Sequence, residues 1–191
     1  MYISNSIFQK VFRRIFPNSR PRMLNKIKDN QKNIISKTRI SSSTFIDHPR
    51  TLELAENVYI GHFNFIEASQ GLKIDTGVQI TSFITITTHS SHQAIRLYGN
   101  AYSGADMLGY IKGPIEIGAY SFIGPHATIM PNTKIGKGCI VSAYSYVKGE
   151  FPDFSIIGGN PAKVIGDTRT LDASFLKENP SLKSNYDAWA K

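Results

Sequence analysis

Residues 117–147 read IGAYSF-IGPHAT-IMPNTK-IGKGCI-VSAYSY-V, so a branched aliphatic residue returns at every sixth position. An earlier series has two gaps of eight residues in place of six, and these gaps lie twenty residues apart. Grouped in threes, the positions form successive coils: 40, 46, 54; 60, 66, 74; 80, 86, 117; 123, 129, 135. A period of six is neither helical nor a simple strand alternation, and it indicates a repeat architecture. We therefore predict an all-β fold, a three-sided parallel β-helix in which each hexad supplies one short strand and one corner.

The same register predicts what lies inside the prism. Each aliphatic residue would stack on its counterparts in the neighbouring coils, which lie about 4.8 Å apart. Four residues after each aliphatic position comes a second, small register, in which we expect Cys139 to be a packed small residue and not a nucleophile. Its members are Ser121, Ala127, Thr133, Cys139 and Ser145. Glycine follows several aliphatic positions, where we expect its permissive backbone to help form the corner: Gly61, Gly118, Gly124 and Gly136.

Composition limits the class of protein. A chain of 191 residues is long enough for one well-cored domain with short appendages. A single cysteine excludes a disulfide framework and is compatible with a reducing cytosol. No run of eighteen apolar residues is present, so we expect no membrane-spanning helix, and the first sixteen residues do not end like a secretory signal. We expect a cytoplasmic protein.

The net positive charge is confined to residues 1–39, which we treat as a basic leader. This segment holds ten basic residues against Asp29 alone, whereas the whole chain has a net charge of +8. Apolar residues at helical spacing before Pro17 predict a short N-terminal helix. Two interpretations stay open: residues 1–22 contact the inner membrane face peripherally, or the helix packs on the β-helix or on a neighbouring subunit. Nucleic-acid binding is not expected, because no recognised motif accompanies the charge.

The remaining chain divides into two parts. Residues 40–166 carry the repeat, and residues 167–191 lose it in favour of short helical stretches broken at Pro180. The end of a solenoid exposes an unpaired strand edge. We therefore predict that residues 167–191 form a C-terminal helical cap.

A long insertion, residues 89–114, interrupts the repeat at a corner and is the first place to look for chemistry. Long irregular loops in compact domains are usually functional or disordered. His89 and His92 stand at its start, and an imidazole can accept a proton near neutral pH. Arg96 and Tyr110, farther along the insertion, are the residues that we expect to contact a substrate together with His92.

Three stretches of the chain resemble the hexapeptide-repeat acyltransferases, in particular the maltose and galactoside O-acetyltransferase branch. They are Thr87-Thr88-His89 before the protruding loop, the coils from Ile117 to Pro131, and the closing stretch IIGGNPAKVI at 156–165. The resemblance covers roughly residues 54–166. It implies a left-handed β-helix, a homotrimer with sites between neighbouring prisms, acetyl-CoA as the co-substrate and no metal.

The resemblance also implies functions for individual residues. His89 matches the general base of those enzymes, with His92 as the competitor for that function. Asn64 approximately matches an asparagine that contacts substrate, and a structural corner asparagine is the alternative. The carboxylate that would orient His89 is Glu116, Asp75 or absent. The donor would be bound by a set of small residues and one lysine: Gly124, Ser142, Ala143, Gly158, Gly159, Asn160 and Lys163.

These expectations favour an acetyl-CoA-dependent O-acetyltransferase that acts on a saccharide of a surface glycan or its precursor. A positioned base can remove the proton of a sugar hydroxyl as that hydroxyl attacks the thioester, so no covalent enzyme intermediate is needed. An N-acetyltransferase of an amino-sugar nucleotide is the nearest alternative. A γ-type carbonic anhydrase, with zinc on histidines such as His62 and His126, is a remote one.

Overall fold

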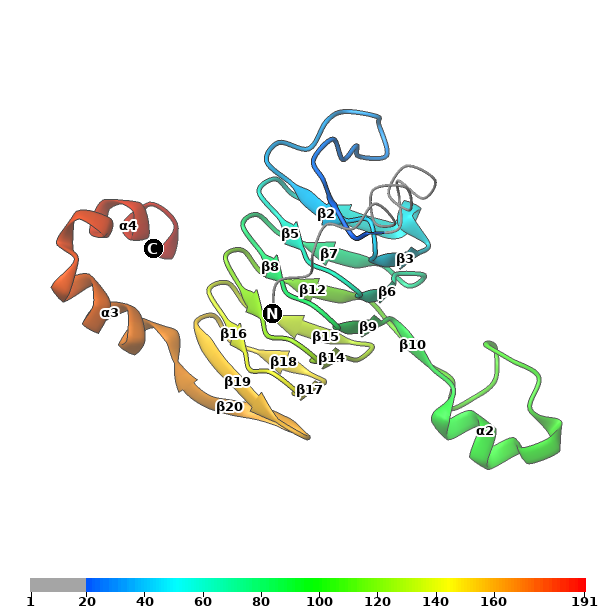
Figure 1. The fold of residues 1–191 in the computed structure, drawn as a ribbon. Helices are drawn as coiled ribbons and strands as arrows, with labels where there is room; N and C mark the ends of the chain where they lie inside the picture. Colours follow the sequence, from blue (N-terminus) through cyan, green and yellow to red (C-terminus); the bar gives the residue numbers. More distant parts are fainter. Residues whose placement is uncertain (1–19) are drawn as a thin grey trace, which may run out of the picture.

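A computed structural model describes residues 20–191, and these form stacked coils with three parallel sheets as their sides (Figure 1). The predicted N-terminal helix lies outside the described residues. The first sheet holds β1 (Met23–Leu24), β2 (Arg39–Ser41), β5 (Tyr59–Ile60), β8 (Gln79–Ile80), β13 (Phe122–Ile123), β16 (Ile140–Val141), β19 (Ser155–Gly159) and β20 (Ala162–Asp167). The second holds β3 (Phe45–Asp47), β6 (Phe65–Glu67), β9 (Thr85–Thr87), β14 (Thr128–Ile129) and β17 (Tyr146–Val147). The third holds β4 (Leu52–Leu54), β7 (Leu72–Ile74), β12 (Ile115–Ile117), β15 (Thr133–Ile135) and β18 (Glu150–Phe151).

The chain visits the three sheets in turn, so the predicted coils are confirmed strand by strand. Ile60 pairs with Ile80 in the first sheet, Ile66 with Ile86 in the second and Ile74 with Ile117 in the third. We name the turns between sheets corner I (first to second sheet), corner II (second to third) and corner III (third to first). The left-handed sense of the coil stays a prediction.

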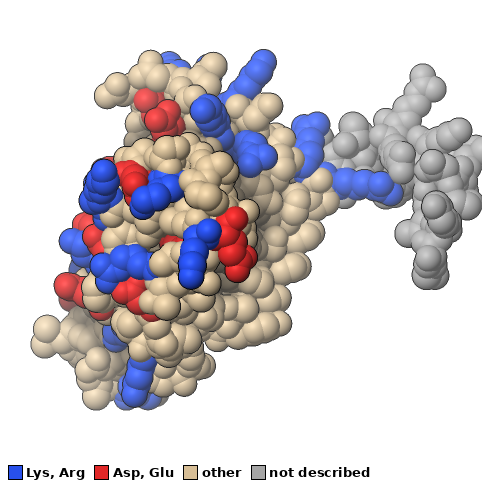
Figure 2. Space-filling model, turned by 90° about the vertical axis from the view of Figure 1, so that its left-hand side faces the viewer, with Lys and Arg blue, Asp and Glu red and all other residues tan. Residues whose placement is uncertain are grey.

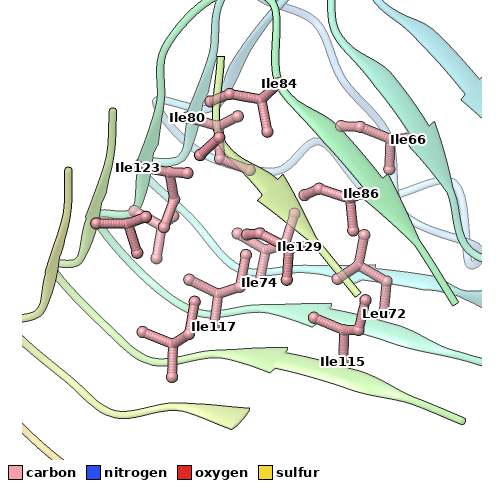
Figure 3. Packing of buried hydrophobic residues seen from close by; sticks show 14 of the residues in the cluster. Ile66, Leu72, Ile74, Ile80, Ile84, Ile86, Ile115, Ile117, Ile123 and Ile129 are labelled. Carbon is pink, nitrogen blue, oxygen red and sulfur yellow. The ribbon is translucent and has the colours of Figure 1, made fainter. Parts of the chain in front are cut away.

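The core is a set of aliphatic columns, as the hexad register predicts. The inward side chains of successive coils lie on one another, and Figure 3 shows this packing from close by. Burial of one such side chain contributes about 2 kcal/mol. The small register is buried as well, and burial raises the pKa of the Cys139 thiol, which donates to the Pro152 carbonyl at 3.2 Å.

The corner glycines are required for a different reason from the one that the sequence suggested. A Cβ atom on Gly118 would lie 2.6 Å from the Gly136 carbonyl carbon, and one on Gly61 would lie 2.4 Å from the Thr81 oxygen. Real Cβ atoms do not approach backbone so closely. The next coil therefore excludes a side chain at these glycines, and their conformational freedom is not what the corner uses.

Left-handed backbone occurs two residues later, and at corner I aromatic side chains occupy it. Four exposed rings from successive coils stack on one another there, so that the stack runs along the prism. Neighbouring ring centroids are 5.2, 5.0 and 4.7 Å apart. We call this set the aromatic strip: Phe63, Phe83, His126 and Tyr144. A left-handed non-glycine residue costs roughly 1 kcal/mol or more, so the coil stacking holds these four residues in an unfavourable conformation.

The outer face of the third sheet is charged and alternates in sign. Its outward residues pair in register from coil to coil, and the Lys134 amine lies 3.7 Å from the Glu116 carboxylate. We call this row the charge ladder: Glu53, Lys73, Glu116, Lys134 and Glu150. Figure 2 shows positive and negative side chains interspersed on one side of the molecule.

Antiparallel strands cover both ends of the first sheet. Residue Met23 in β1 pairs with Ser41, and β20 pairs with β19 through a hairpin. Ile27 packs against the core at the first coil. We expected the C-terminal helices to cover the last strand edge of the solenoid. In the first sheet, β20 covers this edge by pairing with β19.

The predicted C-terminal helices are present as α3 (Thr168–Glu178), the 3₁₀ turn η3 (Pro180–Leu182) and α4 (Lys183–Ala190). They lie beside the prism and not across its end (Figure 1). The Trp189 ring packs on Tyr120 and Phe154 at corner III, with centroid distances of 4.6 and 5.9 Å. Lys137 donates to the Lys191 carbonyl at 2.7 Å. Among residues 20–191, no helix is long and apolar enough to cross a membrane.

Because the next coil leaves no space for a side chain at Gly118, we predict that a single added methyl group there lowers the stability of the fold. Replacing Gly118 by alanine forces adjacent coils apart, so we expect the free energy of unfolding to fall by about 1–3 kcal/mol, the usual range for overpacking. Urea unfolding followed by circular dichroism measures this change. Asp75→Ala is the matched control, because Asp75 holds the same corner position one coil earlier and already accommodates a side chain. Equal stability of Gly118→Ala and the wild type would contradict the proposed role of the glycine.

Candidate active site

The insertion leaves the prism at corner II as an arm, residues 89–114. It begins with β10 (His89–Ser90) and returns through β11 (Ile111–Lys112), and these two strands pair antiparallel. Between them lie α2 (His92–Tyr98) and the 3₁₀ turn η2 (Gly99–Ala101). His89 therefore stands at the paired root of the arm, where the solenoid fixes its position.

A buried glutamate one coil earlier is the partner of His89. Glu67 pairs in register with Thr87, and its Oε2 atom lies 2.9 Å from Nδ1 of His89. Both earlier candidates for this carboxylate are wrong. Glu116 belongs to the charge ladder, and Asp75 accepts a hydrogen bond from the Thr76 backbone.

The surroundings of Glu67 keep its carboxylate ionised. The residue is 3 % exposed, and it accepts hydrogen bonds from the Ser69 backbone at 2.6 Å and from the Thr88 backbone and hydroxyl at 2.8 and 2.7 Å. Burial raises the pKa of Glu67, but the hydrogen bonds from Ser69 and Thr88 outweigh this effect and lower it to about 2. An ionised Glu67 favours a proton on Nδ1 of neutral His89, which leaves Nε2 as the proton acceptor.

Tyr110, on the returning side of the arm, covers the imidazole. The two rings are nearly parallel, with centroids 5.7 Å apart. Burial raises the pKa of the Tyr110 phenol, and the nearby Tyr102 and Glu67 raise it further. The structure thus brings Tyr110 together with His89, and its predicted contact with substrate stays a prediction.

His92 and Arg96 lie farther out, on the exposed helix α2. The ring of His92 interacts through Nδ1 with the Ser90 hydroxyl at 2.7 Å, and Arg96 donates to the His92 carbonyl at 2.6 Å. No hydrogen bond or ion pair found among the described residues joins His92 to a carboxylate. Since a carboxylate contacts His89 and none contacts His92, the geometry favours His89 over His92 as a base.

Asn64 has the surroundings of a structural residue. It is 2 % exposed, its amide donates to the Gly61 and Thr81 carbonyls, and its oxygen accepts from the Ile84 backbone. These bonds tie adjacent coils together at corner I, at the opposite end of β6 from Glu67. We therefore assign Asn64 to the corner and replace it by Glu67 in the candidate catalytic set.

The residues expected to bind the donor gather at corner I. A Cβ atom on Gly124 would meet the Ala143 nitrogen at 2.7 Å, and one on Gly158 would lie 3.3 Å from the Ser142 hydroxyl. These small residues of three successive coils therefore lie side by side in one row, which we call the track: Gly124, Ser142, Ala143 and Gly158. The β19–β20 hairpin continues it: Gly159 pairs with Ala162 and Gly158 with Lys163. Asn160, which precedes Pro161 through a cis peptide bond, and Lys163 are exposed there.

The two halves of the candidate site lie at different corners of one chain. His89 and Glu67 are at corner II, and the track is at corner I, so the second sheet separates them. A three-residue strand of that sheet is about 10 Å long. One chain alone does not bring the imidazole to the track.

His62 and His126 do not converge with His89. His62 interacts with the Ser41 hydroxyl at 2.6 Å, and His126 lies in the aromatic strip, so both are at corner I. Within residues 20–191, no group of three or more histidine, cysteine, aspartate or glutamate residues is placed to hold a metal ion. The carbonic anhydrase alternative therefore gains no support from the placement of these side chains.

Comparison with protein families identifies the repeat. The model described as "Bacterial transferase hexapeptide (six repeats)" matches residues 114–149. Residues 114–149 are thus similar to the hexapeptide repeats of bacterial transferases. This match covers the coils that follow the arm.

Two curated relatives extend the similarity of this hexapeptide-repeat protein. The "Probable acetyltransferase Rv3034c" of Mycobacterium tuberculosis (strain ATCC 25618 / H37Rv) is 29% identical over 123 residues, which are 64% of this chain and 39% of the relative. The "Putative lipopolysaccharide biosynthesis O-acetyl transferase WbbJ" of Escherichia coli (strain K12) is 30% identical over 113 residues, 58% of each chain. The match thus spans less than two thirds of either relative.

A solved structure shares the fold of the hexapeptide-repeat protein. A point mutant of AntD, an N-acyltransferase from Bacillus cereus crystallised with dTDP and coenzyme A, superposes with a TM-score of 0.53 at 24% identity. The match covers 74% of this chain and 88% of that one. At this identity the likeness establishes the architecture alone.

The ionised state of Glu67 predicts a pH-dependent loss of stability on substitution. Its folded pKa of about 2 lies below the usual value of 4.5, so the charge stabilises the fold above pH 4.5, and this contribution is lost as the pH falls toward 2. Glu67→Gln should lower the free energy of unfolding by about 1.5–3 kcal/mol at pH 7, the usual range for hydrogen bonds to a charged group. Thermal unfolding at pH 7 and at pH 3 measures the difference, which should shrink at pH 3. The control is Glu56→Gln, which changes an exposed glutamate. If Glu67→Gln lost as much stability relative to the wild type at pH 3 as at pH 7, this would contradict an ionised Glu67.

Proposed function

We propose that this hexapeptide-repeat protein is an acetyl-CoA-dependent O-acetyltransferase that acts on a sugar hydroxyl of a bacterial-type surface glycan or its precursor. The observation that carries the proposal is His89, held at the root of the arm by the buried Glu67 carboxylate. The acetyltransferase names of the curated relatives support the reaction class. The name of WbbJ supports a glycan acceptor.

In the proposed reaction His89 acts as the general base. Nε2 takes the proton of the acceptor hydroxyl while the hydroxyl oxygen forms a bond to the thioester carbonyl carbon. The C–S bond then breaks, the acetyl group stays on the acceptor, and the thiolate leaves with the electron pair of that bond. The imidazolium can return the proton to the thiolate. Glu67 stabilises the imidazolium in between, and Tyr110 restricts the ring to one orientation.

The track at corner I fits the donor because its residues are small and its outer members, Ala143 and Gly159, are exposed. A side chain at Gly124 or Gly158 would occupy the space between coils, and Ser142 and Ala143 are small. Gly159 and Asn160 extend the track into the hairpin, where the Lys163 ammonium is exposed and can meet a phosphate. Acetyl-CoA would supply the activated acetyl group, and these residues would bind and orient it.

A complete site then requires more than one copy of the chain, and we propose a homotrimer. His89 of one copy would face the track of the next, since the two lie at different corners of one prism. The surfaces support this arrangement: the aromatic strip at corner I is exposed, whereas the charge ladder keeps the third sheet hydrated. Exposed apolar surface of this kind marks association sites.

Substitution of the proposed base should abolish transfer while it preserves donor binding. His89→Gln should lower kcat about 10²–10⁴-fold, the usual contribution of a general base. Acetyl-CoA affinity, measured by calorimetry, should stay within about threefold. His92→Gln is the matched comparison and should mainly raise the acceptor KM. The assay uses hydroxyl and amino sugars in parallel, and acetylation of the amine alone would redirect the proposal to N-acetylation.

The lysine of the hairpin tests the donor site. Lys163→Ala removes one phosphate contact, so the KM for acetyl-CoA should rise about three- to tenfold with little change in kcat. Lys148→Ala, an exposed lysine one coil earlier at corner II, should leave that KM unchanged. An unaltered KM in Lys163→Ala would remove this residue from the donor site.

Mixing two inactive variants tests whether sites are shared. Ala143 is exposed, so Ala143→Trp should block the track without disturbing the core, and His89→Gln removes the base. In a co-refolded equal mixture the two variants assemble at random into closed rings. At about one interface in four, a subunit with an intact base then meets a neighbour with an intact track, so the mixture should recover about one quarter of wild-type activity. An inactive mixture, with both variants folded and assembled, would place each site within one chain.

A further inference from the structure

A second histidine approaches the buried carboxylate that orients His89. Three coils meet at corner II, where Asp47, Glu67 and Thr87 pair in register along the second sheet. His48 follows Asp47, and its Nδ1 atom lies 3.9 Å from Oε1 of Glu67, the oxygen that His89 does not use. One carboxylate therefore stands between two imidazoles that belong to different coils.

The backbone fixes where His48 stands. Its φ angle is 57°, in the left-handed region, and its carbonyl accepts from the Thr51 hydroxyl at 2.8 Å. The ring Nδ1 also lies 3.1 Å from the Asp47 carboxylate. The His48 side chain is 56% exposed, so the ring is open to solvent, whereas Glu67 is buried.

The groups that face this pair come from four parts of the chain. Asp47 and Arg50 lie on the His48 side, at the end of β3 and in the 3₁₀ turn η1 (Pro49–Thr51). Glu67 comes from β6. From the arm come His89, Tyr102 and Tyr110, and burial raises the pKa of the Tyr110 hydroxyl. Among these side-chain types, imidazole is the one that ordinarily changes charge between pH 5 and 8.

We propose that His48 is a positioning residue that controls how strongly Glu67 holds the protonated form of His89. A protonated His48 attracts the Glu67 carboxylate and thereby weakens the attraction between Glu67 and a protonated His89. The two positively charged rings also repel each other. Glu67 is buried, whereas both rings are partly exposed, so solvent and salt screen this competition only in part. A proton on one ring therefore disfavours a proton on the other. The kinetic consequence rests on the proposed function, whereas the coupling itself does not.

The coupling can be measured without any assay of transfer. Histidine ring ¹⁵N NMR of the full chain across pH 5–9 follows His89 directly. In the wild type its curve should be broader than that of a single proton. In His48→Gln the His89 curve should become as steep as that of a single proton. Its midpoint should move to higher pH by on the order of half a pH unit, because the variant removes one positive charge that is partly screened by solvent. His62→Gln, at corner I, is the matched control and should leave the curve unchanged.

The rate gives the second readout. The acid limb of kcat/KM in His48→Gln should move to higher pH by the same amount, with kcat on the alkaline plateau within about twofold of the wild type. A one-proton wild-type curve, or a His89 curve that His48→Gln does not change, would overturn the proposed coupling. A changed NMR curve in a protein that acetylates no acceptor would instead preserve the coupling and contradict the proposed function.

Discussion

The structure depends on the close stacking of one coil on the next. Neighbouring strands lie about 4.8 Å apart, so every residue meets its counterpart in the adjacent coil at a fixed register. Inward positions must then be aliphatic in every coil, and corner positions that touch backbone above must lack a side chain, as at Gly61 and Gly118. The hexad in the sequence is a direct consequence of this spacing.

The same register builds the candidate site. Glu67 and His89 are 22 residues apart in sequence, yet the stacking of β6 on β9 places their side chains in contact. A long insertion can leave the prism at corner II without disturbing the columns, because Ile86 and Ile117 still occupy consecutive hexad positions. The arm is therefore free to vary, while the solenoid holds the root that carries the imidazole.

The sequence predicted the coils and the arm, because each depends on a local period or on its interruption. It placed His89 at the start of the arm, and the function of His89 as a base stays a proposal. It did not identify Glu67, because polar residues at corners look alike in sequence. The usable signal was the period of twenty, which puts Glu67 directly beside Thr87. The environment of Asn64 was unpredictable for a related reason: its hydrogen bonds go to carbonyls of two coils, and no sequence pattern distinguishes these bonds from a contact with substrate. The helices were predicted, but their place beside corner III depends on Trp189 and Lys137, which lie far apart in the sequence.

The alternating charges of the third sheet also restrict how a solenoid of this kind can change in length. Repeat proteins lengthen and shorten by whole repeats. Loss of the coil that holds Lys73 would bring Glu53 against Glu116, and duplication of any single coil would likewise set two like charges side by side. Like charges directly opposite each other destabilise a sheet. Removal or duplication of two coils together keeps the alternation, so on this face the chain tolerates changes of coil number in pairs better than changes by one.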